Sequence, residues 1–131
     1  MLFLLVVVSA IVLIKTQTSK TQQETASVVK GSFLADFPTF PLFSGANIVS
    51  SQHSNQTASY QAYLTSSSSV SEIINWYQSE LQKDGWNLVS GPDSKQSDDQ
   101  NIILSKGNMT ATVNVEHENN VSNISIYIII K

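Results

Sequence analysis

The sequence predicts an α+β fold, in which an antiparallel sheet carries one helix on one of its faces and is preceded by an N-terminal hydrophobic segment. Three observations predict this class. Residues 70–84 have the spacing of an amphipathic helix, and the stretches on both sides of them alternate apolar and polar residues as strands do. Short segments with Gly and Asn separate the later strands, as in hairpins. The expected element order is ββαββββ.

The N-terminal segment, residues 1–14, reads MLFLLVVVSAIVLI and contains no charged residue. A bilayer span needs about 20 apolar residues, so three interpretations stay open. The segment is a signal-anchor or transmembrane segment whose basic front end is missing, a signal peptide whose cleavage leaves a secreted protein, or the stalk of a pilin-like filament subunit. We favour the first. A buried core helix fits less well, because a helix that is apolar on every face needs cover on every side.

Residues 15–30 are mostly polar and have no apolar periodicity before their end, which predicts a solvated linker. Lys15 and Lys20 follow the hydrophobic segment and no Lys precedes it, so charge alone does not orient the segment in a membrane. The remaining residues, 31–131, are expected to form an α+β domain outside the cytoplasm.

Three Phe residues recur with a period of three at the start of this domain, at Phe37, Phe40 and Phe43. Pro38 and Pro41 each restrict the preceding Phe to extended backbone, and a polyproline II helix has three residues per turn. The rings are therefore expected on one face of an extended segment, which we call the aromatic ladder. We favour a ladder that covers part of the core, because three exposed Phe rings would form a large apolar patch. The alternative is an exposed strip for a partner or for the membrane interface.

Six strands are expected around the helix. They span residues 47–54, 58–65, 86–90, 102–106, 109–116 and 121–130. A polar turn at Asn55-Gln56 separates the first two, whose register is weakly set because their apolar residues do not pair cleanly. The last three are joined by Gly107-Asn108 and Asn119-Asn120, which are two-residue loops of the hairpin type.

The helix has clear signals at both ends. Ser69 and Glu72 have the spacing of a capping box, in which each side chain satisfies a backbone amide of the first turn. Gly85 suits the left-handed position that follows a helix. The apolar residues between these signals lie on one helix face; they are Val70, Ile73, Ile74, Tyr77 and Leu81.

The register of the last three strands follows from their turns. If Lys106 pairs with Met109 and Glu118 pairs with Val121, all the apolar pairs collect on one face. These pairs are Ile102–Val113, Leu104–Ala111, Val113–Ile126, Ala111–Ile128, Val115–Ile124 and Met109–Ile130. This face is expected to pack on the apolar side of the helix.

The opposite face of the same strands is less polar than a water-facing sheet should be. Tyr127 and Ile129 lie on it, and Ile103 joins them through its neighbour Thr112. We therefore expect an interaction surface at Ile103, Tyr127 and Ile129, with the rings of the aromatic ladder as further candidates. The cover is either the ladder, folded back across this face, or a protein partner or second copy of the domain. We favour a partner or second copy.

Several stretches resemble an uncharacterised family of small membrane-anchored bacterial proteins. The stretches are FPLFSGANIVSS, the strand pair ending in Thr65, SVSEIINWYQSELQKDGW and a strand bearing KGN. The family has an aromatic-Pro-Gly-Ala motif and a Ser-capped helix that ends in Gly-Trp. The matching residues are Phe43, Gly45, Ala46, Thr65, Trp76, Tyr77, Leu81, Gly85 and Trp86. The resemblance covers about residues 37–131, with Ser44 where the family often has Pro. It implies the fold and an extracytoplasmic location, and it carries no catalytic residue or ligand.

The composition excludes several classes of function. The chain has no Cys, which excludes disulfides, thiol catalysis and zinc–thiolate sites. Its net charge is −3 and all its basic residues are Lys without a basic stripe, so nucleic acid is not an expected partner. There is no Gly-rich phosphate loop and no nucleophile elbow, and no cofactor is expected.

The two His residues do not predict a metal site or a catalytic base. In Glu116-His117-Glu118, a strand would point His117 away from both Glu side chains. His53 lies alone near a turn. No catalytic, cofactor-binding or metal-binding residue is predicted, and the protein is expected not to be an enzyme.

These observations together predict a membrane-tethered extracytoplasmic domain, which acts as a non-enzymatic binding or scaffolding module held at the membrane through residues 1–14. The first alternative is a pilin-like filament subunit that uses the same segment as its assembly stalk. The second is a hydrolase whose site the sequence does not reveal.

Overall fold

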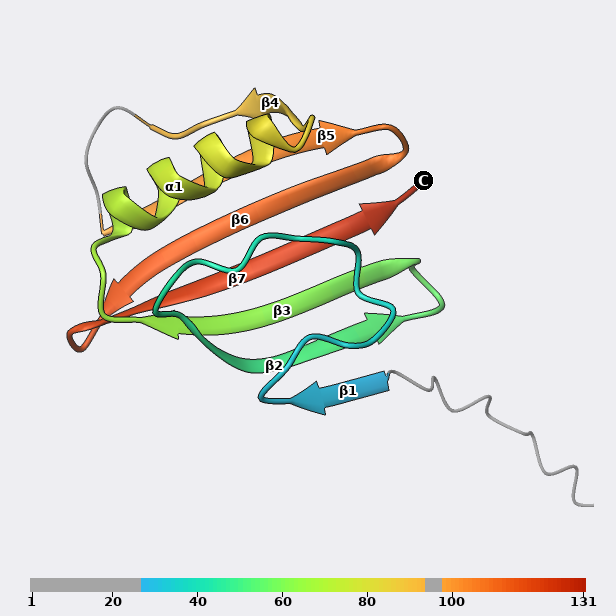
Figure 1. Cartoon of the computed structure of the whole chain (residues 1–131), viewed down its shortest axis with the longest axis horizontal. Helices are drawn as coiled ribbons and strands as arrows, with labels where there is room; N and C mark the ends of the chain where they lie inside the picture. The colour runs from blue at the N-terminus through green and yellow to red at the C-terminus, as the bar shows by residue number, and fades with distance from the viewer. Residues whose placement is uncertain (1–26, 94–97) are drawn as a thin grey trace, which may run out of the picture.

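A sheet of seven antiparallel strands forms the body of the protein in the computed structural model, which describes residues 27–93 and 98–131 (Figure 1). The strands lie in the order β1-β2-β3-β7-β6-β5-β4, so the last strand of the chain occupies the middle of the sheet. They are β1 (Ser27–Lys30), β2 (Asn47–Ser54), β3 (Ser59–Ser66), β4 (Asn87–Ser90), β5 (Asp99–Lys106), β6 (Met109–Glu118) and β7 (Val121–Ile130). The helix α1 (Val70–Lys83) lies between β3 and β4 in the chain. The predicted α+β character is confirmed.

The strand β1 is a difference from the prediction. The sequence places residues 15–30 in a linker, whereas Ser27–Lys30 pairs with β2 and the element order is βββαββββ. Val29 lies opposite Ser51 and is half-buried. A strand of four residues is too short for its alternation to stand out from the polar residues before it.

The predicted register of the last three strands is confirmed at every pair, from Lys106–Met109 and Glu118–Val121 through to Met109–Ile130. Asn119 and Asn120 both have positive φ, 53° and 63°, as a type I′ hairpin turn requires. The strands β5 and β6 are longer than predicted, because polar residues at their ends also pair.

The pairing of β2 with β3 contains a β-bulge between Ile48 and Ser50. The bulge lets Ile48 and Ser51 lie on the same face of the sheet while Val49 is exposed. It explains why the apolar residues of these two strands do not alternate cleanly. The strand β3 then pairs with β7, a contact between distant parts of the chain that no local pattern predicts.

The helix α1 has the predicted start and buried face. The Ser69 Oγ accepts a hydrogen bond from the Glu72 N–H at 3.2 Å, and this bond satisfies one of the free amides of the first turn. Gly85 follows the C-cap residue with a φ of +88°. All residues of the predicted apolar stripe are buried, and the helix ends at Lys83, one residue earlier than predicted.

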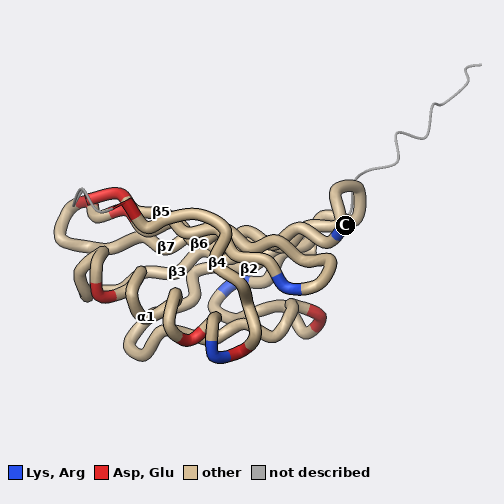
Figure 2. The backbone as a smooth tube through the Cα atoms, turned by 90° about the horizontal axis from the view of Figure 1, so that it is seen from above, with Lys and Arg blue, Asp and Glu red and all other residues tan. Residues whose placement is uncertain are grey.

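Two segments share one face of the sheet, the inner face. The helix α1 packs on β4, β5 and β6, and residues 31–46 cross β7, β3 and β2 on the same side (Figures 1 and 2). Phe40 and Phe43 are buried in the same core cluster as the helix, and Phe37 packs against it. The ladder therefore covers part of the core, as predicted. The alternative in which it folds back across the opposite, outer face is wrong, because its rings are held among the aromatic residues of the inner face.

The predicted hydrophobic segment at residues 1–14 lies outside the described residues, as does most of the predicted linker. Within residues 27–93 and 98–131, no helix is both long and apolar enough to cross a membrane. The described domain begins at β1 and not at residue 31.

Gly91 provides a test of how closely β4 and β5 pack at the end of their pairing. Its φ is +76°, and a Cβ atom there would overlap the backbone carbonyl of Asn101 in β5. We expect Gly91→Ala to lower the free energy of unfolding by more than about 2 kcal/mol, since a left-handed φ alone costs about 1–2 kcal/mol and the carbonyl cannot rotate away. Urea unfolding measures this loss.

The matched control is Gly85→Ala, at a φ of +88° with only an ordinary contact to the Lys106 side chain. This variant should lose about 1 kcal/mol, the cost of the left-handed φ. Equal losses for the two variants would show that the overlap with Asn101 does not govern the effect.

Candidate functional site

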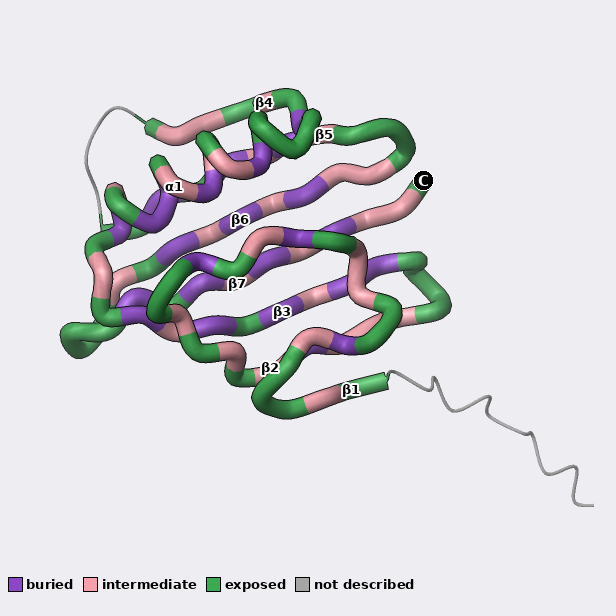
Figure 3. The backbone as a smooth tube through the Cα atoms, viewed as in Figure 1, coloured by how far each residue is buried: buried purple, intermediate pink, exposed green. Residues whose placement is uncertain are grey.

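Buried residues recur along the sheet strands and the helix where the inner face meets its cover (Figure 3). A side chain without accessible surface touches neither solvent nor a cavity that could hold a water molecule. This holds for Ala62, Ile73, Tyr77, Leu81, Ile102, Leu104, Ala111, Val113, Val115 and Ile128. A ligand could enter between helix and sheet only if this layer repacked.

Tyr77 lies where the helix meets the aromatic ladder. Its hydroxyl accepts a hydrogen bond from the Phe43 N–H at 3.4 Å, and its ring centroid lies 6.0 Å from that of Phe40 and 5.0 Å from that of Trp76. Burial raises the pKa of Tyr77 to about 12, and the Phe43 N–H opposes this rise in part. The phenol is therefore neutral at ordinary pH, and it links the helix to the ladder.

The raised pKa of Tyr77 predicts a loss of stability in alkali. Below pH 10 the phenol is neutral in both the folded and the unfolded chain, so its ionisation does not lower the free energy of unfolding. Between pH 10 and about 12 the unfolded chain ionises while the folded chain does not, so the free energy of unfolding falls by up to about 3 kcal/mol. Chemical unfolding at several pH values should show a smaller fall for Tyr77→Phe than for the native chain.

The control for this measurement is Tyr63→Phe, which removes an exposed phenol and should leave the fall unchanged. Tyr60 is present in all three proteins, so its contribution cancels in the comparison. If Tyr77→Phe keeps the full fall, the buried phenol is not its source.

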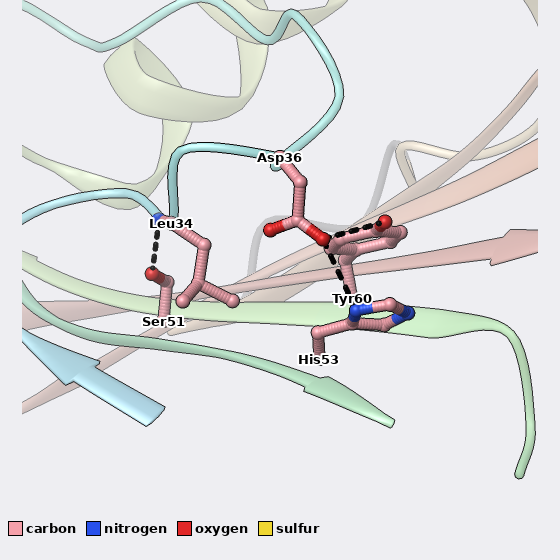
Figure 4. Close-up of polar contacts among 5 residues, drawn as sticks. All are labelled: Leu34, Asp36, Ser51, His53 and Tyr60. Carbon is pink, nitrogen blue, oxygen red and sulfur yellow. Dashed lines mark hydrogen bonds and ion pairs between the residues drawn. The ribbon is translucent and has the colours of Figure 1, made fainter. Parts of the chain in front are cut away.

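Asp36, His53 and Tyr60 form a cluster beside the start of the aromatic ladder (Figure 4). The Asp36 Oδ2 lies 3.2 Å from the His53 Nδ1 and accepts a hydrogen bond from the Tyr60 hydroxyl at 3.3 Å. The rings of His53 and Tyr60 stack with their centroids 4.1 Å apart and their planes at 9°. Burial raises the pKa of Tyr60, and the charge of Asp36 and the hydrogen bond to it add to this rise.

The geometry of this cluster favours attachment over catalysis. An Asp–His pair can activate a nucleophile that approaches the other imidazole nitrogen. Here the Tyr60 hydroxyl bonds the carboxylate of Asp36 instead, and a raised pKa makes it a weak nucleophile. Nearby, the Leu34 N–H donates to the Ser51 Oγ at 2.8 Å, and this hydroxyl donates to the Ser32 carbonyl at 2.9 Å. Together these bonds fasten residues 32–36 to β2 and β3.

No pattern in the sequence points to this cluster. His53 looks isolated because its partner, Asp36, comes from an irregular segment before β2. Only the crossing of residues 31–46 over the sheet brings the two together, and no spacing rule describes that path.

The predicted ladder residues lie on the inner face. Phe40 packs edge-on to Trp86 with centroids 6.0 Å apart, and Phe43 packs edge-on to Trp76 at 5.3 Å. Both Phe rings are buried, so the exposed-strip alternative is wrong for them. Phe37 is half-buried between Phe33 and Tyr60.

Ile103, Tyr127 and Ile129 lie together on the outer face, through the pairings of Thr112 with both Ile103 and Tyr127. All three are half-buried by their neighbours on the sheet. Figure 2 shows α1 and residues 31–46 on one side of the sheet, and no described segment crosses the other side. The three residues therefore share one face, as predicted, and no described segment covers it.

On the outer face, residues that pair across β2, β3, β7, β6 and β5 form rows. Three neighbouring rows contain no charged residue from β2 to β5, and we call them the uncharged rows. In order from β2 through β3, β7 and β6 to β5 they are Ser54, Ser59, Ile129, Thr110 and Ser105; Gln52, Gln61, Tyr127, Thr112 and Ile103; and Ser50, Tyr63, Ser125, Asn114 and Asn101. Charged residues lie at the margin of these rows: Lys30 of β1 pairs with Ser50 at the end of the third row, and Asp99 pairs with Glu116 in the row next to it.

A hollow of about 150 Å³ opens at one end of the uncharged rows. It is lined by Gln52, His53, Ser54, Thr57, Ser59, Gln61 and Tyr127. The Gln61 Oε1 accepts hydrogen bonds from the Gln52 Nε2 and from the Tyr63 hydroxyl, the latter at 3.4 Å. These bonds hold two amides and a phenol next to the Tyr127 ring. The sequence did not reveal them, because Gln and Ser occur throughout this chain without distinctive spacing.

No metal site forms in the part of the chain that the structure describes: no three His, Cys, Asp or Glu side chains come together there. His117 Nδ1 lies 3.1 Å from the Ser122 Oγ, which donates to the Ser68 carbonyl at 2.6 Å. Glu116 and Glu118 are exposed. His117 and the two Glu residues thus alternate along the strand, as predicted.

Comparison with known proteins gives one match. A family model described as START domain-like matches residues 48–122, from β2 into the start of β7, which is more than half of the chain. No curated protein and no solved structure matches the chain. Of the residues that carry the predicted resemblance, those from Thr65 to Trp86 fall within the match, whereas Phe43, Gly45 and Ala46 precede it.

Proposed function

We propose a function from one premise: the chain belongs to the START domain-like family. Membership favours a ligand-binding fold, and it leaves open where the ligand lies. The layout offers two places, the layer between helix and sheet and the outer face of the sheet.

The filled inner layer is the observation that carries the proposal. Its side chains are buried, and ten of them have no accessible surface, so a ligand there would have to displace well-packed groups at a cost of several kcal/mol, as in other overpacked cores. The outer face needs no rearrangement. It is open, and it presents Ile103, Tyr127 and Ile129 among polar residues.

The protein is accordingly a non-enzymatic binding module that contacts its partner through the outer face of the sheet. It is tethered to a membrane through the apolar residues 1–14 and has its domain outside the cytoplasm. Two features support a binding role over a catalytic one. In the Asp36–His53–Tyr60 cluster the Tyr60 hydroxyl bonds Asp36 and not His53, and the hydrogen bonds of the cluster attach the aromatic segment.

The tether and the location can be tested in the source organism. The full chain should sediment with the membranes and should be degraded when protease is added to intact spheroplasts. A chain without residues 1–14 should remain in the soluble fraction. Full protection of the native chain from external protease, with degradation only after lysis, would contradict an extracytoplasmic domain.

The contact face can be tested by placing a photo-reactive phenylalanine analogue at Tyr127 in the full chain in its native membrane. We expect irradiation to give a cross-linked product from this position, because Tyr127 is half-buried on the open outer face. The same analogue at Gln82, exposed on α1, is the control and should give none. Products from Gln82 alone, or from neither position, would place the contact elsewhere.

A further inference from the structure

We propose that the uncharged rows bind a neutral, linear oligosaccharide, with one sugar ring in the hollow beside Tyr127. This inference rests on the proposed function, since it takes the outer face as the contact surface. It adds the chemical class of the ligand, and it is argued from charge, polarity and shape.

The rows contain no charged side chain, and this favours an uncharged ligand. The three rows present hydroxyl, amide, aromatic and aliphatic side chains from β2 to β5, and none of them is ionised. Lys30 adjoins Ser50 at the β1 end of the third row, and Asp99 and Glu116 lie in the row next to it, so charges of both signs occur at the margin of this surface. A phosphate, a polyanion or a basic peptide would find no counter-charge within the rows themselves.

The polarity of the face selects a ligand that is itself rich in hydrogen-bonding groups. An apolar partner, or a second copy packed face to face, would take the amides and hydroxyls of the rows out of water, at about 1–3 kcal/mol for each group left unpaired. Each sugar hydroxyl both donates and accepts a hydrogen bond, so it can pair with either type of side chain. Such a ligand can therefore replace the hydrogen bonds that these side chains make to water with hydrogen bonds to its own hydroxyls.

The aromatic residues supply the apolar part of the contact. Tyr63 lies opposite Ser125, and Tyr127 is two residues further along β7, so the two rings are diagonal neighbours about 7–8 Å apart at their backbones. Tyr63 is 42% exposed. A pyranose ring presents C–H groups on its flat faces, and these pack on phenol rings while the hydroxyls at its rim reach the neighbouring amides. Ile129 and Ile103 extend the apolar contact along the rows.

The hollow fixes where one sugar ring sits. The Oε1 of Gln61 is engaged by Gln52 and Tyr63, so the N–H groups of Gln61 are the donors that it offers to a ligand. The volume of about 150 Å³ is below the roughly 300–1,000 Å³ of pockets that enclose a whole small molecule. The hollow therefore suits one unit of a longer chain. Five strands spaced about 4.8 Å apart give the rows a length of about 19 Å, which leaves room for further units.

The test uses the full chain in micelles of a detergent without a sugar headgroup, because a glycoside detergent would compete. Cellohexaose and chitohexaose are the neutral probes and polygalacturonate is the acidic one, with affinities from calorimetric titration. We expect binding of at least one neutral probe and none of polygalacturonate. Tyr127→Ala and Gln61→Ala should each weaken it at least about tenfold, the size expected for a lost aromatic or hydrogen-bond contact. Tyr127→Phe should bind like the native chain.

Two controls separate binding from folding and from association. Gln82→Ala changes an exposed amide on α1 and should bind the probe normally, and thermal unfolding of every variant shows whether the fold persists. Sedimentation velocity reports self-association of the same samples. If no neutral probe binds while the native chain dimerises and Tyr127→Ala abolishes the dimer, the oligosaccharide is wrong and the outer face remains a contact surface. If no probe binds and Tyr127 gives no cross-link in the membrane, both proposals fail.

Discussion

One helix is too narrow to cover a seven-stranded sheet, and the architecture of this domain follows from that mismatch. A helix with its side chains is about 10–12 Å wide and strands lie about 4.8 Å apart, so α1 covers two or three of them. It lies on β4, β5 and β6, and the other strands need a second cover. Residues 31–46 provide it: Phe40 and Phe43 are buried in the core, and Phe37 packs against it (Figure 1). Pro38 and Pro41 restrict this backbone before folding, which lowers the entropy lost when the rings are buried.

The segment of residues 31–46 is held near both of its ends, to the helix at one and to the sheet at the other. At one end Tyr77 accepts the Phe43 N–H, and at the other Asp36 contacts His53 and Tyr60. With the segment fixed at both ends, its rings and the helix stripe bury most of the inner face. This close packing is why the proposed contact surface lies on the side of the sheet that faces away from the helix.

The parts of this fold that were predicted correctly depend on residues that lie close together in the sequence. The helix carries its own cap at Ser69, and the Asn119-Asn120 turn fixes the register of two long strands at once. The parts that were missed join distant segments. The strand β1 is too short to show a pattern. The contact between Asp36 and His53 depends on how an irregular segment crosses the sheet. The hollow at Gln61 was missed for another reason: amides are so common in this chain that neither their number nor their spacing marks a site.

The central position of β7 limits when the native sheet can form during synthesis. This strand, Val121–Ile130, follows all the other strands in the chain, yet it lies between β3 and β6 and bonds to both. Until it is present, β1–β3 and β4–β6 are two separate three-stranded pieces with no sheet hydrogen bonds between them. Neither piece can bury both sides of the core cluster, and closing it requires contacts across a large loop. The nascent chain therefore cannot complete its native sheet before β7 has been synthesised. For any route that threads a polypeptide through a membrane in an unfolded state, this keeps the chain in a form that can be exported.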